Sequence, residues 1–227
     1  MGSDDYFHKR KARTNATLER QRKERARSQR FLIVCEGTKT EPYYLKEMVD
    51  SLGIRPQAVR IAPNDGASPD RIVTHAIKLY EDDAIGGDSF DKVFCVFDRD
   101  EHSTFGAAVQ SIKDLNNTEN PKPFEAITSI PCFEYWLLLH FGFTDQPFEA
   151  VGKKSVCERV IKVLRTKPGF QKYGKGQQGV YGLLKDGMPT AIEGAKRGRE
   201  SAIKTGQDGP LTQVDLLVGV LQVLGKK

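Results

Sequence analysis

The chain contains Phe31-Leu-Ile-Val-Cys-Glu36 and Val93-Phe-Cys-Val-Phe-Asp98-Arg-Asp100, two apolar runs that each end in acidic residues. Short continuous apolar runs are typical of strands buried on both faces of a parallel sheet. If the two runs form neighbouring strands, Glu36, Asp98 and Asp100 meet at the carboxyl edge of the sheet, where α/β folds bind ligands. These stretches therefore predict both a sheet and the position of a site.

The rest of the chain predicts an α/β fold with a mostly parallel sheet flanked by helices. Further strands are expected over 59–62 and 126–130, and helices over 43–52, 70–83, 104–116, 155–165, 180–186, 189–205 and onward from Thr212. Strands that alternate with helices form parallel sheets covered on both faces. We therefore expect a basic, flexible arm over residues 1–30, an α/β core over 31–145 and a mainly helical extension over 146–227 packed on the core.

Three carboxylates that converge at one edge repel one another unless a positive charge lies among them. A divalent cation is the natural candidate, and oxygen ligands favour Mg²⁺ or Mn²⁺. Each acidic cluster alone could instead cap a helix or face water. The two clusters together favour a metal site formed by Glu36, Asp98 and Asp100.

The loop after the first run carries Thr38, Lys39 and Thr40, so a cation and hydroxyls lie near Glu36. Such a mixture suits phosphate chemistry, and we expect Glu36, Asp98, Asp100 and Lys39 to be catalytic. The expected reaction is attack of water or a ribose hydroxyl on a phosphodiester. The chain has no Walker A motif, so any nucleotide-hydrolysing engine would be a separate protein.

Glu134 lies in Pro131-Cys-Phe-Glu-Tyr-Trp-Leu-Leu-Leu-His-Phe141, an apolar segment that predicts a largely buried helix. Two roles stay open for this residue. Its carboxylate could satisfy backbone amides at the helix start, or it could join Glu36 at the sheet edge as a further metal ligand. His140 is expected to be a hydrogen-bonded core histidine rather than a ligand.

Positive charge is concentrated at the amino terminus. Residues 1–30 hold 10 Lys or Arg and 4 Asp or Glu, whereas the whole chain has a net charge of +5. The arm is either a solubilising tail or a contact for a nucleic-acid backbone through Lys9, Arg10, Lys11 and Arg13. The loop over 167–176 is likewise either a solvated linker or a nucleic-acid contact through Lys172 and Lys175.

The four cysteines are widely spaced and form no Cys-x-x-Cys pair, so they are expected to be reduced core residues. No apolar stretch approaches the roughly 20 residues needed to span a bilayer, and no signal-peptide pattern follows the basic residues. We therefore expect a cytoplasmic protein that does not interact with membranes.

Three motifs together resemble the RloB-like family of Toprim-type abortive-infection proteins. They are Ile33-Val-Cys-Glu-Gly-Thr-Lys-Thr-Glu-Pro-Tyr-Tyr44, Val96-Phe-Asp-Arg-Asp100 and the segment from Pro131 to Phe141. The resemblance implies a Toprim-like core in which Glu36 matches the family glutamate and Asp98 and Asp100 match its Asp-x-Asp. His102 stands where the Toprim pattern often has a further acidic residue, so the number of metals stays open.

The resemblance also implies a function in defence against phage. It implies a nuclease effector that cleaves RNA, such as transfer RNA, or DNA, and that acts with a separately encoded AAA/ABC-type ATPase. A homo-oligomer is a further expectation. The alternative is a non-catalytic subunit that holds nucleic acid or the ATPase. A primase or topoisomerase is disfavoured because the chain has no zinc-ligand spacing and little room for another domain.

Overall fold

The computed structural model describes residues 29–64, 68–87, 89–99, 103–145, 147–148, 155–206 and 209–226. Asp100 lies outside the described residues. So do Lys9, Arg10, Lys11 and Arg13 of the basic arm. Their roles stay predictions.

A five-stranded sheet with the order β2-β1-β3-β4-β5 forms the centre of the molecule. The strands are β1 (Phe31–Cys35), β2 (Val59–Pro63), β3 (Lys92–Asp98), β4 (Phe124–Ile130) and β5 (Leu211–Thr212). The first four strands are parallel, and β5 pairs antiparallel with β4. The predicted α/β class and the adjacency of the two apolar runs, now β1 and β3, are both confirmed.

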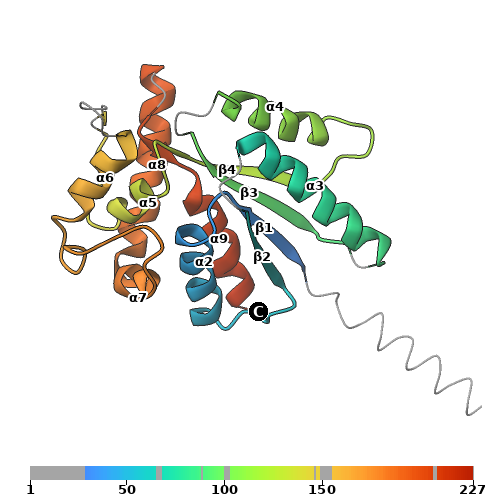
Figure 1. The fold of residues 1–227 in the computed structure, drawn as a ribbon, viewed down its shortest axis with the longest axis horizontal. Coiled ribbons are helices and arrows are strands. Elements are labelled where there is room, and N and C mark those ends of the chain that lie inside the picture. Colours follow the sequence, from blue (N-terminus) through green and yellow to red (C-terminus); the bar gives the residue numbers. More distant parts are fainter. Residues whose placement is uncertain are drawn as a thin grey trace, which may run out of the picture.

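Helices cover both faces of the sheet (Figure 1). One face carries α3 (Pro69–Ile85) and α4 (Phe105–Asn116), whose apolar residues share a core with Leu32, Cys95 and Phe97. The other face carries α2 (Thr40–Ser51), α5 (Glu134–Leu139) and α9 (Val214–Gly225). This second core is larger, because α6 (Val156–Leu164), α7 (Val180–Leu184) and α8 (Met188–Thr205) also contribute to it.

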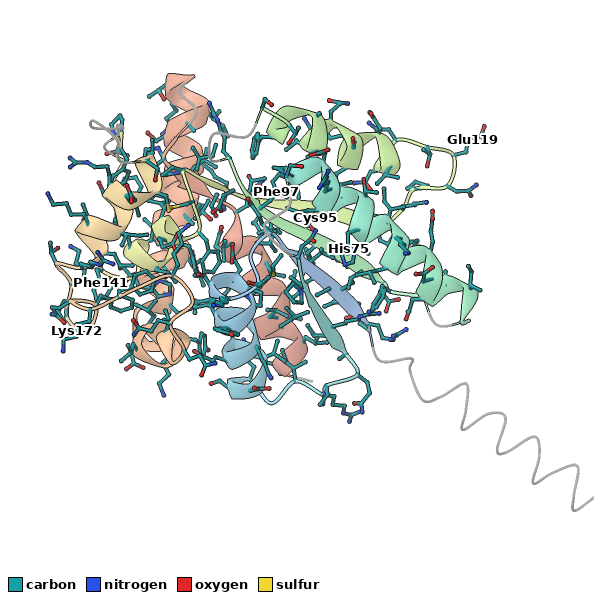
Figure 2. All side chains as sticks on the ribbon, viewed as in Figure 1. His75, Cys95, Phe97, Glu119, Phe141 and Lys172 are labelled. Atoms are coloured by element: carbon teal, nitrogen blue, oxygen red, sulfur yellow. A yellow bond between two sulfur atoms is a disulfide. The ribbon has the colours of Figure 1, made fainter. Side chains whose placement is uncertain are left out.

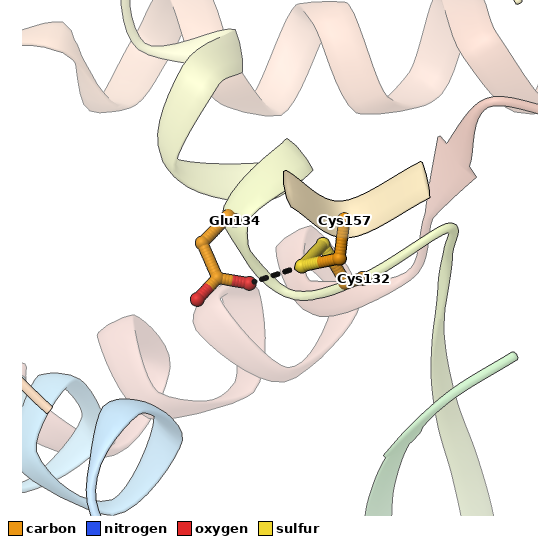
Figure 3. Close-up of side chains that lie close together, drawn as sticks. All are labelled: Cys132, Glu134 and Cys157. Atoms are coloured by element: carbon orange, nitrogen blue, oxygen red, sulfur yellow. Dashed lines mark hydrogen bonds between the residues drawn. A yellow bond between two sulfur atoms is a disulfide. The ribbon is translucent and has the colours of Figure 1, made fainter. Parts of the chain in front are cut away.

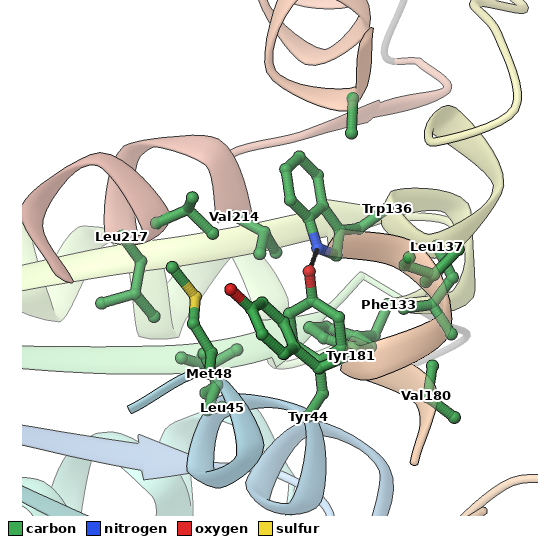
Figure 4. Close-up of a cluster of buried hydrophobic side chains, with 14 of the residues drawn as sticks. Tyr44, Leu45, Met48, Phe133, Trp136, Leu137, Val180, Tyr181, Val214 and Leu217 are labelled. Carbon is green, nitrogen blue, oxygen red and sulfur yellow. Dashed lines mark hydrogen bonds between the residues drawn. The ribbon is translucent and has the colours of Figure 1, made fainter. Parts of the chain in front are cut away.

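The larger core contains a polar link between two buried aromatic residues. Trp136 Nε1 donates a hydrogen bond of 3.0 Å to the Tyr44 hydroxyl (Figure 4). His140 lies against both rings; its Nδ1 is 3.0 Å from the Trp136 carbonyl oxygen, and burial lowers its pKa to about 4. The sequence predicts a hydrogen-bonded core histidine at this position, and the structure places His140 in such a setting.

The carboxy-terminal helices are fixed to the sheet by a partly buried ion pair. Arg199 on α8 donates two hydrogen bonds to Asp215 in the first turn of α9, one of them at 2.7 Å, and a third to the Thr212 carbonyl oxygen at 2.7 Å. The start of α6 is stabilised by a capping box between Ser155 and Glu158. None of the described helices is long and apolar enough to cross a membrane.

The structure corrects two sequence-based expectations. Cys132 and Cys157 form a disulfide, whereas all four cysteines were expected to be reduced; Cys35 and Cys95 are free and buried as expected. The spacing of 25 residues carries no pairing signal. The helix expected from Pro131 onward is also shorter, because α5 spans only Glu134–Leu139.

Candidate metal centre

Glu36 and Asp98 meet at the carboxyl edge of the sheet. Glu36 directly follows β1, and its backbone N–H continues the ladder to the Val96 carbonyl oxygen at 3.0 Å. Asp98 is the last residue of β3, and its backbone N–H donates to Glu36 Oε2 at 2.8 Å. The parallel register of β1 and β3 therefore places the two carboxylates beside each other, as the sequence predicts.

Glu41 is a third carboxylate of the site, and sequence reasoning did not single it out. It lies in the first turn of α2, only 7% exposed. Gly37 leaves room for it, since a Cβ at Gly37 would lie 2.6 Å from Glu41 Oε2. Burial, together with the charges of Glu134 and Glu36, raises the pKa of Glu41 to about 7.

Glu134 is the fourth carboxylate and comes from the first turn of α5. It is 1% exposed. The Tyr173 hydroxyl donates to Glu134 Oε1 at 3.3 Å, and Lys175 Nζ lies 3.8 Å from Oε2. The pKa of Glu134 is raised by burial, against the opposing effects of Lys175, its own backbone N–H and Tyr173. Glu134 thus interacts with the backbone at its helix start, and its charge also acts on Glu41 and Asp98. Its role as a metal ligand stays a prediction.

We call Glu36, Glu41, Asp98 and Glu134 the carboxylate cluster. The other three carboxylates all act on Asp98. Burial and the charges of Glu41, Glu134 and Glu36 together raise its pKa well above the usual range. A hydrogen bond with the Phe133 backbone acts in the opposite direction. The four carboxylates come from two strand ends and two helix starts, and burial raises the pKa of three of them, Glu41, Asp98 and Glu134.

Of the predicted lysines in the described part of the chain, Lys175 lies beside Glu134 of the cluster. Its positive charge lowers the pKa of both Glu41 and Glu134. Its segment is fixed there, because the backbone N–H of Gly176 donates to Thr40 Oγ1 at 2.9 Å. Lys172 is exposed at the outer edge of the helical side of the molecule (Figure 2). The stem of Lys39 lies against Gly176, and its catalytic role stays a prediction.

The residues of the cluster fit a divalent cation by donor type. Among the described residues, only Cys132, Glu134 and Cys157 form a group of three whose ligand atoms all lie within 4.8 Å of one another, so the carboxylates would have to draw closer to share an ion. Burial raises the pKa of Glu41, Asp98 and Glu134, and repulsion from neighbouring carboxylates adds to this for Glu41 and Asp98. A cation with two charges would relieve the repulsion by binding the ionised forms. All four donors are carboxylate oxygens, which suit Mg²⁺ or Mn²⁺ better than a thiophilic metal. Asp100 would follow Asp98 by two residues, outside the described part of the chain.

The disulfide borders the carboxylate cluster. Cys132 Sγ, Cys157 Sγ and a carboxylate oxygen of Glu134 lie within 4.8 Å of one another (Figure 3). Cys157 Sγ is 3.2 Å from Glu134 Oε2. While the two sulfurs are bonded to each other, they do not offer thiolates to a metal, so the oxygen donors are the ones available to a cation.

Comparison with known families agrees with the motifs around this site. A family model described as RloB-like protein matches residues 31–221, which is most of the chain. The chain belongs to the RloB-like family. No curated protein and no solved structure matches it. In this RloB-like protein the matched region includes the whole carboxylate cluster, Lys175 and both disulfide cysteines.

Proposed function

We propose that this RloB-like protein is a Toprim-type, metal-dependent endonuclease that hydrolyses phosphodiesters in RNA or DNA. The carboxylate cluster carries the proposal: four acidic side chains converge at the carboxyl edge of a parallel sheet, with one lysine beside them. A protein that only binds phosphates gains nothing from buried negative charge, because carboxylates repel the backbone of nucleic acids. A reaction that depends on a bound cation would explain why four carboxylates gather at this edge of the sheet.

The position of each residue suggests its role in the proposed reaction. Glu36 and Asp98, and Asp100 if it lies with them, would hold Mg²⁺ or Mn²⁺ at the strand ends, and Glu41 and Glu134 would complete the oxygen donors. The bound cation would stabilise the charge that develops on the phosphate oxygens. Lys175, whose side chain is 55% exposed, reaches from solvent to the cluster and can contact a phosphate that enters there.

For the biological setting, the support is membership of the family rather than the geometry of the site. We propose that the protein is the effector of an abortive-infection system directed against phage, with a separately encoded AAA/ABC-type ATPase as partner. The basic arm, through Lys9, Arg10, Lys11 and Arg13, and the exposed Lys172 would contact the nucleic-acid backbone.

The test is cleavage of labelled transfer RNA, single-stranded DNA and plasmid DNA in Mg²⁺, Mn²⁺ or EDTA, with and without the ATPase. Glu36→Gln and Asp98→Asn should each abolish metal-dependent cutting. Glu125→Gln is the matched control, because this acidic residue lies near the start of β4, at the opposite end of the strands, and pairs with Lys92 on the surface. Its activity should equal that of the wild type.

The opposite result would favour the alternative, a non-catalytic subunit that holds nucleic acid or the ATPase. That result is no cutting under any condition, with nucleic-acid binding kept by Glu36→Gln and lost when residues 1–30 are removed. Cutting that survives in both cluster variants would also contradict the proposal, since the activity would then belong to another site or to a contaminant.

A further inference from the structure

The disulfide joins the two helix starts nearest to Glu134. Cys132 lies in the turn between β4 and α5, two residues before Glu134, and Cys157 lies in the first turn of α6. Their Cα atoms are 5.8 Å apart, a separation that suits a disulfide. The bond therefore ties α6 to the short turn that positions one carboxylate of the cluster.

The oxidation state of this pair changes what Glu134 contacts. Cys157 Sγ lies 3.2 Å from Glu134 Oε2, within reach of a hydrogen bond from a thiol. A reduced Cys157 can donate its S–H to this oxygen, whereas a disulfide sulfur has no hydrogen to donate. Glu134 Oε1 already accepts from Tyr173, whereas Oε2 faces both Lys175 Nζ at 3.8 Å and the sulfur. Of these neighbours, the sulfur is the one whose hydrogen depends on the redox state.

We propose that Cys132 and Cys157 are a redox-controlled pair that regulates cation binding by the carboxylate cluster. The inference rests on the proposed function, because it concerns the same site. In the disulfide form, Oε2 of Glu134 has no thiol donor and is held in place for the cation. In the reduced form, the Cys157 thiol competes with the cation for Oε2 and α6 is no longer tied to the turn, so the cation binds more weakly. If the protein is cytoplasmic, as the sequence predicts, the disulfide lies in a reducing compartment, where such bonds are usually transient or redox-sensing.

The conversion is a thiol–disulfide exchange with a dithiol reductant. A thiolate of the reductant attacks Cys157 Sγ, the bond between the two cysteine sulfurs breaks, and Cys132 leaves as a thiolate that takes up a proton. The second thiol of the reductant then attacks the mixed disulfide and releases Cys157 as a thiol. Two electrons pass from the reductant, which becomes a disulfide. Because both sulfurs are buried, the attack requires local opening of α6.

The other two cysteines provide internal controls. Cys35 on β1 and Cys95 on β3 are free and buried in the strands, so they should stay reduced throughout. In the full-length chain, incubation with glutathione disulfide should leave two thiols that iodoacetamide can alkylate after denaturation. Incubation with dithiothreitol should leave four. Intact mass spectrometry counts them directly and needs no nuclease activity.

Mn²⁺ affinity, measured by electron paramagnetic resonance, tests the link to the cluster. One competing hydrogen bond predicts that the reduced chain binds Mn²⁺ about three- to tenfold more weakly than the oxidised chain. Cys157→Ser keeps a donor and should bind like the reduced chain, whereas Cys157→Ala lacks the donor and should bind more tightly than Cys157→Ser. Neither variant should respond to dithiothreitol. Cys95→Ala should keep the full redox response.

Three results would overturn the inference. Four alkylated thiols after glutathione disulfide would show that the pair does not form. Equal Mn²⁺ affinities of the oxidised and reduced chains would show that it does not influence the cluster. One zinc ion retained per reduced chain, and lost in Cys157→Ala, would show a thiolate metal centre instead.

These outcomes are separable from those of the nuclease assay. A chain that cuts nucleic acid with redox-independent Mn²⁺ affinity would contradict the inference alone. A chain whose Mn²⁺ affinity depends on the disulfide, but that never cuts, would contradict the nuclease alone.

Discussion

Replacing Glu41 with glutamine should stabilise the protein at neutral pH and weaken its binding of divalent cations. Burial, and then the charges of Glu134 and Glu36, raise the pKa of Glu41 from 4.5 to about 7. Between these values the folded state binds more protons than the unfolded state. Its stability therefore falls as the pH rises through this window, and the loss is complete above pH 7. A shift of this size corresponds to about 3 kcal/mol at pH 8.

The difference between variant and wild type isolates this effect. His140 contributes the opposite trend in both proteins: its pKa is lowered from 6.5 to about 4, so stability is lost as the pH falls through that window. Subtracting the two unfolding free energies at each pH cancels this term. Urea unfolding in EDTA should give nearly equal stabilities at pH 4.5, and Glu41→Gln should be more stable by up to about 3 kcal/mol at pH 8. Mn²⁺ should then stabilise the wild type more than the variant.

Glu47→Gln in the same helix is the matched control. The carboxylate of Glu47 accepts hydrogen bonds from the backbone N–H groups of Gly179 and Tyr181, at 2.5 and 3.0 Å. Its neutralisation should therefore destabilise the protein by about 1 kcal/mol, the opposite sign from Glu41→Gln. If Glu41→Gln destabilises the protein at pH 8, or differs from the wild type by a constant amount at every pH, the carboxylates do not repel one another as argued.

Three other substitutions test separate parts of the structure. Gly37→Ala would place a Cβ 2.6 Å from Glu41 Oε2. The Mn²⁺ affinity should therefore fall at least about tenfold, while the circular dichroism spectrum stays unchanged. An unchanged affinity would contradict the placement of Glu41. Arg199→Met leaves the buried Asp215 without its partner and should lower the free energy of unfolding by about 3 kcal/mol in urea titrations. The His140→Gln variant should lose less stability than the wild type as the pH falls from 6.5 to 4, measured as the urea midpoint of unfolding at each pH. An equal loss in both proteins would show that this histidine does not stay neutral in the fold.

The sheet was predictable because its central strands are buried on both faces. Such strands appear in the sequence as continuous apolar runs. The two apolar runs, residues 31–35 and 93–97, coincide with β1 and β3 to within about one residue at each end. The strand β5 was not predictable, since it has two residues and is defined by its pairing with Ser129 and Ile130 on β4. These residues of β4 and β5 are far apart in the sequence, so their pairing depends on tertiary packing rather than on the local pattern of apolar residues.

The site residues at strand ends could be predicted from the sequence, whereas Glu41, at the start of a helix, could not. Glu36 and Asp98 follow apolar runs, whose carboxyl ends in a parallel sheet meet at one edge. Glu41 lies in a helical first turn, where an acidic residue usually interacts with the helix dipole and faces water. What distinguishes Glu41 is Gly37, whose missing side chain leaves space for the buried carboxyl group. A glycine in the loop just after a strand, such as Gly37 after Glu36, followed by an acidic residue in the first turn of the next helix, is therefore the local signal for a carboxylate directed back toward the sheet edge.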